Sequence, residues 1–283
     1  MILITAANGK TGRHVIPQLA AVGEQVRAFV HTQDAADLKS LGAEEVMAGD
    51  LLDAPGLAKA MAGVRAVVHV GPPFHPHETE MGKAVIDAAV AAQVERFVYF
   101  SVIHPQLGAL VNHRAKLPVE EHLLESGLNY TVLQPMHYMQ NIRVRDVVQS
   151  GVLWQMIDLD RRLSHVDLAD AAEVAVKALT EDGHFGATYE LCGNDHLSGV
   201  ELAAVISRES GRPVEARRLP LENFLSFGAI AASGDHQKDG MRRLFEYYGR
   251  HGIFGNANVL TWLLGRPPTT FAEYVRREMN AAG

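Results

Sequence analysis

The sequence predicts an α/β fold, a doubly wound parallel sheet with a small, mainly helical carboxy-terminal lobe. Short apolar runs alternate with helical stretches over the first two thirds of the chain. These runs are continuously hydrophobic, as is typical of strands that are buried on both faces. Several helical stretches end at glycine, namely at Gly23, Gly42, Gly63 and Gly127. Alternation of this kind builds right-handed βαβ crossovers and therefore a parallel sheet.

The order of the elements follows from this periodicity. Strands are expected at residues 2–5, 25–30, 45–48, 66–70, 96–101 and 129–134. Helices are expected near residues 12–22, 35–41, 55–61, 78–92 and 115–126, and Asp34 is expected to cap the second of them. This succession indicates a Rossmann sheet.

After Gln134 the regularity weakens, and residues 135–163 have the mixed aromatic, methionine and polar character of a covering loop and helix. A helix at 166–180 and a strand at 187–192 are expected to return to the main sheet. Further helices are expected at 198–210, 221–232, 236–250 and 269–279, with a strand in 211–219 and a loop at 265–270 that caps the last helix through Thr269 or Thr270. We therefore expect a main domain over 1–195, with 135–163 partly covering the site, and a lid lobe over 196–283.

Composition limits the class of protein. With 283 residues, 47% of them hydrophobic, the chain can bury a large core. The net charge of -7 argues against a nucleic-acid partner. A single cysteine, Cys192, excludes an intrachain disulfide or a cysteine zinc cluster, so we expect a core residue in a cytoplasmic protein. The sequence shows neither the charged region of a signal peptide nor an apolar run of about 20 residues, so we expect no targeting or membrane segment. A homodimer is plausible for this fold, but no feature locates an interface.

The first strand runs into a glycine turn that is typical of nucleotide sites. Ala6, Gly9 and Gly12 follow the spacing G-x-x-G-x-x-G, with alanine in place of the first glycine. A methyl group at Ala6 is expected to be tolerated only if φ stays negative. The helix that follows would present unpaired N–H groups and the positive end of its dipole to a diphosphate.

The motifs taken in order resemble one family over nearly the whole chain. They are TAANGKTGR at 5–13, GDLLD at 49–53, GPP at 71–73, ERFVYFSV at 95–102, HRAKLPVEEHLLESGLNYTVLQP at 113–135 and GRPPTTFAEYVRRE at 265–278. This set resembles the NmrA-like family, which are atypical relatives of the short-chain dehydrogenases/reductases. The resemblance implies an NAD(P)-binding Rossmann domain with a small substrate lobe. It also implies a division between NADPH-dependent reductases and redox sensors that bind the cofactor without turnover.

The resemblance and the strand ends together predict the cofactor contacts. The residues are Ala7, Asn8, Gly9, Lys10, Thr11 and Gly12 at the pyrophosphate, His31 at the end of the second strand, Asp50 and Leu51 at the adenine, Gly71, Pro72 and Pro73 beside the riboses, and Lys116 and Pro135. Asp50 could instead cap the next helix, and residues 71–73 could form a plain turn.

The choice of cofactor depends on the end of the second strand. An acid there hydrogen-bonds the ribose 2′-OH, whereas a cation accommodates a 2′-phosphate. This chain has His31 where similar proteins often carry arginine, no acid at 30–33, and Lys10 and Arg13 in the glycine turn. We therefore expect NADP(H) rather than NAD(H).

The helix with Lys116 raises the question of catalysis. Ordinary short-chain dehydrogenases carry Tyr-x-x-x-Lys, in which lysine holds the nicotinamide ribose and lowers the pKa of the tyrosine. Lys116 matches that lysine, but Asn112 stands at the tyrosine position and its amide cannot act as a general acid. His113 and His104 are alternative proton donors, although each could equally be a histidine of a loop or helix surface.

Apolar side chains near the ends of the strands suggest a substrate pocket. Phe74, Met136, His137, Tyr138, Met139 and Trp154 are candidates for lining a pocket for a flat substrate, although such spacing is also typical of simple packing. His75 and His77 resemble a metal pair, but no further ligands lie nearby in the sequence, so we expect a surface loop and no metal.

The leading hypothesis is an NADPH-dependent reductase of a small carbonyl, quinone or related conjugated compound, working by direct hydride transfer without a tyrosine acid. The rival hypothesis is a non-catalytic regulator that senses NADP(H), which the lost tyrosine favours. A sugar-nucleotide epimerase is a weaker third hypothesis, because it would need a proton-transferring tyrosine at position 112.

Overall fold

A computed structural model describes residues 1–32 and 35–281, and the chain forms two compact units. Unit 1 comprises Met1–Gly108, Asn112–Pro135 and Leu168–Glu190. Unit 2 comprises Ala109–Val111, Met136–Asp167 and Leu191–Gly283. The division therefore differs from a single cut at residue 195, because the stretch expected only to cover the site belongs to unit 2. The cap expected at Asp34 lies outside the described residues.

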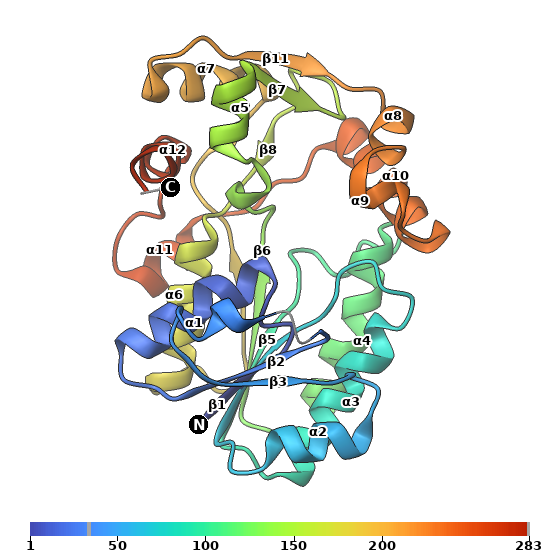
Figure 1. The fold of residues 1–283 in the computed structure, drawn as a ribbon, viewed down its shortest axis with the longest axis vertical. Coiled ribbons are helices and arrows are strands. Elements are labelled where there is room, and N and C mark those ends of the chain that lie inside the picture. Colours follow the sequence, from blue (N-terminus) through green and yellow to red (C-terminus); the bar gives the residue numbers. More distant parts are fainter. Residues whose placement is uncertain (33–34, 282–283) are drawn as a thin grey trace. The chain divides into compact units, whose positions relative to one another are not determined.

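Unit 1 is built on a seven-stranded sheet (Figure 1). Its strands are β1 (Ile2–Ile4), β2 (Val26–Val30), β3 (Ala43–Ala48), β4 (Ala66–Val70), β5 (Arg96–Phe100), β6 (Tyr130–Pro135) and β9 (Ala187–Leu191). Their spatial order is β3-β2-β1-β4-β5-β6-β9, and β1 to β6 pair in parallel. The order reverses direction between β1 and β4, where open α/β sheets bind their ligands. The predicted fold class is confirmed.

Helices cover both faces of this sheet. They are α1 (Lys10–Ala21), α2 (Ala54–Met61), α3 (Glu78–Ala91), α4 (Val111–Glu125) and α6 (Leu168–Thr180). Figure 1 shows α1 and α6 on one face and α2, α3 and α4 on the other. Gln18 on α1 donates a hydrogen bond to the carbonyl of Ala169 on α6 (2.9 Å). The helix expected at 35–41 is wrong, since only a short 3-10 turn forms at Ala36–Leu38.

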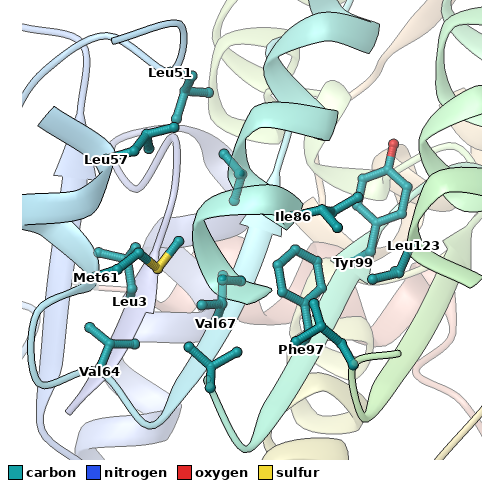
Figure 2. Close-up of a cluster of buried hydrophobic side chains, with 14 of the residues drawn as sticks. Leu3, Leu51, Leu57, Met61, Val64, Val67, Ile86, Phe97, Tyr99 and Leu123 are labelled. Atoms are coloured by element: carbon teal, nitrogen blue, oxygen red, sulfur yellow. The ribbon is translucent and has the colours of Figure 1, made fainter. Parts of the chain in front are cut away.

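The main core of unit 1 lies between the sheet and helices α2 to α4. Leu3, Val67 and Phe97 project from β1, β4 and β5, and Met61 and Ile86 meet them from α2 and α3 (Figure 2). Burial of these side chains provides the main stabilisation of the fold, at about 1.5–3 kcal/mol for each large apolar side chain.

Within the residues that the structure describes, unit 2 contains small sheets and seven helices. Strands β7 (Val152–Gln155) and β11 (Glu215–Arg218) pair in parallel, and β8 (Leu163–Ser164) and β10 (His196–Leu197) pair antiparallel. Its helices, apart from a 3-10 turn at Met139–Asn141, are α5 (Val144–Ser150), α7 (Gly199–Ser210), α8 (Leu221–Leu225), α9 (Gly228–Ala231), α10 (Asp235–His251), α11 (Asn258–Leu264) and α12 (Phe271–Asn280). Helix α12 packs against α7 and α5, and Ile206 and Phe271 are fully buried there.

Two expectations for this region have clear outcomes. Thr270, rather than Thr269, caps the last helix: its side chain accepts a hydrogen bond from the Glu273 N–H in a capping box. The single helix expected at 221–232 is wrong, because α8 ends at Leu225 and α9 begins only at Gly228, whose φ of 56° is left-handed. Over the described residues, every helix is too short or too polar to cross a membrane.

Candidate cofactor and active site

The glycine turn after β1 is tightly packed. The Gly9 N–H donates to the Ala6 carbonyl (2.9 Å), and a side chain at Gly12 would place its Cβ 2.3 Å from the Ala7 carbonyl oxygen. Gly12 therefore allows the start of α1 to lie directly against Ala7, in the turn that follows β1. Ala6 adopts a φ of 46°, so the expectation of a negative φ is wrong, and the methyl group is held in the left-handed region.

The start of α1 has the chemistry of an anion site. Its N-cap is Gly9, which offers no capping side chain, and no acid lies in the first turn of the helix. Asn8, Gly9 and Lys10 are exposed, whereas Thr11 and Gly12 are buried beneath them. Unpaired N–H groups at a helix N-terminus bind phosphate groups, so this part of the predicted cofactor set fits a diphosphate. Ala7 is fully buried and supports the turn from below.

Basic side chains lie beside this turn. The Nε of Arg13 donates to the Asn8 carbonyl (3.0 Å), and its Nη1 lies 2.5 Å from Asp37 Oδ2. The hydrogen bond and the positive charge of Arg13 lower the pKa of Asp37. His31 is exposed directly after β2. Arg13 is thus held next to the backbone of the turn, with Asp37 as its counterion.

Asp50 and Leu51, which follow β3, lie in different surroundings. Asp50 is exposed, and its Oδ1 accepts a hydrogen bond from the Leu52 N–H (2.9 Å). Leu51 is 9% exposed and belongs to the apolar cluster of Figure 2. Helix α2 begins later, with Asp53 at its N-cap, so Asp50 closes the preceding turn rather than the helix itself. This turn does not preclude an adenine contact, which stays a prediction.

Gly71 brings the loop after β4 close to Lys116. A Cβ atom built at Gly71 would lie 3.5 Å from Glu78 and 3.7 Å from the Nζ of Lys116. Gly71 is buried, whereas Pro72 is half-buried and Pro73 is exposed. On the other side, the Pro135 carbonyl accepts a hydrogen bond from the Ile103 N–H (3.1 Å) and joins the ends of β6 and β5.

Lys116 forms a buried ion pair with Glu78, a residue that the sequence reasoning missed. The Nζ of Lys116 lies 2.7 Å from Glu78 Oε1, and their side chains are 8% and 1% exposed. Glu78 is the first residue of α3, where an acid commonly stabilises the positive end of a helix. The sequence did not indicate the contact of Glu78 with Lys116, because an acid at a helix start is common and its burial cannot be read from the sequence alone.

A second buried carboxylate lies one helical turn further along α4. Glu120 accepts hydrogen bonds from Ser101 on one oxygen and from the Gln134 amide on both (2.9 and 3.1 Å). Burial raises the pKa of Glu120, and these hydrogen bonds and the charge of Lys116 oppose the rise. The i, i+4 spacing from Lys116 could have identified Glu120 as a neighbour on the same helix face.

Aromatic side chains form the floor beneath Lys116. The ring centre of Tyr99 lies 5.7 Å from the Lys116 Nζ, and Figure 2 shows its hydroxyl pointing away from the apolar cluster. Burial, with the charges of nearby carboxylates, raises the pKa of Tyr99. His69 stacks on Tyr99 at 5.4 Å and hydrogen-bonds with Thr5 Oγ1 (2.8 Å). Burial lowers the pKa of His69 to about 3, so this imidazole is neutral near pH 7.

The structure places His113 and Asn112 on the first turns of α4. The Nδ1 of His113 donates to the His104 carbonyl (3.0 Å), which can only accept, so the proton resides on Nδ1. Burial lowers the pKa of His113 to about 4, and its Nε2 therefore carries a lone pair near pH 7. Among the described residues, neither His113 Nε2 nor Asn112 Oδ1 has a hydrogen-bond partner, although both atoms are buried. The side chain of His104 faces Glu190 instead, at 3.5 Å.

The six substrate candidates are divided between the units. Phe74 is half-buried in unit 1 with a left-handed φ of 61°. In unit 2, Met136 and Met139 are buried, and Met139 packs in the apolar cluster with α12. His137 and Tyr138 are half-buried, whereas Trp154 is 49% exposed on β7. Met139 therefore serves the packing of unit 2.

Two further results concern ligand sites. No group of three or more metal-binding side chains is assembled within the residues that the structure describes, and the rings of His75 and His77 lie 5.8 Å apart. Unit 2 has a cavity of about 300 Å³ lined in part by Ile157, Arg218 and Phe245, and none of the predicted substrate residues lines it.

The chain is similar to several known proteins over nearly its whole length. The chain is 30% identical to an NAD(P)H azoreductase of Xenophilus azovorans, over 100% of this chain and 99% of that protein. It is 28% identical to quinone oxidoreductase 2 of Escherichia coli, over 99% of each chain. A crystal structure of an NADPH-dependent quinone oxidoreductase from E. coli in complex with NADPH superposes with a TM-score of 0.81, at 28% identity over 99% of this chain and 100% of that one. Residues 1–275 match the model of the NmrA-like family, and the chain belongs to that family.

Proposed function

We propose that this chain is an NADPH-dependent reductase of quinones or related conjugated compounds, including azo dyes. The observation that supports the proposal best is the position of Lys116. Its ammonium group is buried beside Gly71 at the end of β4, in the same unit as the anion-binding start of α1. The relatives named as a quinone oxidoreductase and an azoreductase span nearly the full chain and support the same reaction class.

The residues of unit 1 have distinct roles in this proposal. The turn from Asn8 to Gly12 holds the diphosphate, and Arg13, Lys10 and His31 favour a cofactor with a 2′-phosphate. Bound NADPH supplies the hydride. Gly71 leaves its position without a side chain, so that a ligand can approach Lys116 along the backbone.

Reduction of a quinone also requires a proton, and Lys116 is the best-placed donor. Its neighbour His113 directs its only proton at the His104 carbonyl and is uncharged near pH 7, so it offers an acceptor. Lys116 carries up to three N–H donors that can hydrogen-bond a ribose hydroxyl or a developing phenolate. A quinone is readily reduced by hydride transfer, so a weak acid suffices and tyrosine is not needed at position 112.

The test is steady-state oxidation of NADPH with a panel of quinones, azo dyes, enones and aldehydes. We expect turnover with quinones or azo dyes, and Lys116→Met should lower kcat/KM by about 100-fold, as for loss of a general acid. Arg114→Met is the matched control, because Arg114 is an exposed cation on the same helix.

Two outcomes would refute the proposal. Tight binding of NADPH with no turnover on any member of the panel would favour the rival, a regulator that senses NADP(H). A lower dissociation constant for NADH than for NADPH would overturn the cofactor assignment.

A further inference from the structure

Glu78 connects the loop after β4 with the helix that carries Lys116. It is 2% exposed at the start of α3. One of its oxygens, Oε1, lies 2.7 Å from the Lys116 Nζ, and the other, Oε2, accepts a hydrogen bond from the Phe74 N–H (3.2 Å). A single carboxylate thus contacts both the proposed proton donor and the loop that carries a candidate substrate residue.

The burial of this pair makes each charge depend on the other. Moving a lone ammonium or carboxylate out of water is costly, and an opposite charge at contact distance offsets most of that cost. Without Glu78, the Lys116 ammonium would stay buried with no opposite charge at contact distance.

The other titratable groups around Lys116 cannot replace Glu78. His69 on β4 and His113 on α4 are uncharged near pH 7, because burial lowers their pKa values to about 3 and about 4. Tyr99 on β5 contacts Lys116 with its ring, and its pKa is raised. Glu120 on α4 already accepts hydrogen bonds from two other side chains. Among the described groups, only Glu78 lies within ion-pair distance of Lys116.

The contact between Glu78 and Lys116 leaves N–H donors of the ammonium group for a ligand. Glu78 Oε1 lies close to Lys116 but accepts no well-aligned hydrogen bond from the described residues. Glu78 therefore faces one side of the Lys116 ammonium, which carries three N–H donors, and the donors on its other sides can turn towards a ligand. Both side chains lie directly beneath Gly71, where any larger residue would meet them.

We propose that Glu78 is a positioning residue that holds the Lys116 ammonium beneath Gly71 through its charge. This inference rests on the proposed function, in which Lys116 contacts the cofactor or the substrate. It assigns a role in the reaction to a residue outside the glycine turn and outside the Tyr-x-x-x-Lys pattern.

The first experiment measures stability of the protein without NADPH. Glu78→Gln keeps an acceptor for the Phe74 amide but removes the charge, and should lower Tm by at least about 4 °C because a buried ammonium loses its partner. Adding Lys116→Met to that variant should recover part of the loss. Glu80→Gln is the matched control, since Glu80 is an exposed acid in the same helical turn, and it should change Tm by less than about 2 °C.

The second experiment measures NADPH binding and quinone reduction against pH. Glu78→Gln should lower kcat/KM about 10- to 100-fold near pH 7. The pH profile of kcat/KM should change in Glu78→Gln and should stay as in the native protein in Glu80→Gln. In a Lys116→Met background, Glu78→Gln should change kcat/KM by less than about twofold.

The outcomes separate this inference from the proposed function. If the native protein neither binds NADPH nor reduces quinones, the proposed function fails and the inference fails with it. If the native protein is active but Glu78→Gln behaves like Glu80→Gln, or its effect adds fully to that of Lys116→Met, only the role of Glu78 is refuted.

Discussion

Replacement of Gly12 by alanine should damage the fold before it affects the chemistry. An added Cβ would lie 2.3 Å from the Ala7 carbonyl oxygen, 2.6 Å from its Cα and 2.7 Å from its carbonyl carbon. These are backbone atoms of a fully buried residue whose N–H is bound to the Phe29 carbonyl (3.2 Å), so they cannot rotate away as a side chain would. The start of α1 must therefore move away from the backbone of Ala7.

Overpacking of a well-packed core costs about 1–3 kcal/mol, and the upper end applies here because three backbone atoms are involved. At about 2–4 °C for each kcal/mol, the Tm of Gly12→Ala should fall by about 6–12 °C. Thermal unfolding followed by circular dichroism measures this shift.

Gly9→Ala is the informative comparison. Gly9 is exposed with an ordinary φ of -73°, and its added Cβ would meet only the Ala6 carbonyl oxygen at 3.1 Å. We expect little change in Tm but an approximately tenfold weaker NADPH affinity, because a methyl group would obstruct the anion site at the helix start. A Gly12→Ala protein that unfolds within about 2 °C of the native one would refute the packing argument.

Two further predictions concern stability. Ala6→Gly should raise the free energy of unfolding by about 0.5–1 kcal/mol, because relief of the left-handed φ outweighs the added freedom of the unfolded chain; a lower urea midpoint would contradict this. Buried His69, His113 and His165 have pKa values of about 3, 4 and 3 and take up protons only on unfolding as the pH falls below about 6.5. Each histidine should therefore lower the free energy of unfolding by about 1.4 kcal/mol at about pH 5.5 relative to about pH 7.5. Urea titration at the two pH values measures the difference, and an unchanged free energy of unfolding would refute the prediction.

The sequence was most informative where burial on both faces made a segment uniformly apolar. The strand expected at 66–70 is β4 without change, and the one expected at 25–30 begins one residue later. The same reasoning was less useful in unit 2, where β7 pairs with β11. Each of these strands has only four residues, and β11 is almost wholly polar, so their pairing depends on tertiary contacts rather than on local pattern.

The candidate site shows the same limit. Lys116 and the glycine turn were found from motifs, because their spacing reflects a local backbone requirement. Glu78 and Glu120 were missed, because a carboxylate near a helix end or on a helix face is usually solvated. Their burial arises only when α3 and α4 pack on the sheet, and that information is distributed over distant segments.

The discontinuous make-up of the units affects the order in which the protein can fold during synthesis. The apolar cluster of unit 2 joins Val144 of α5 and Ile206 of α7 to Phe271 of α12, so it is incomplete until α12 has left the ribosome. Folding of unit 1 likewise requires α6 and β9, which are synthesised after the first part of unit 2. No single cut of the chain therefore separates the two units, because the three segments of unit 1 alternate along the chain with those of unit 2. Exchange of either unit with that of a relative requires at least two crossover points.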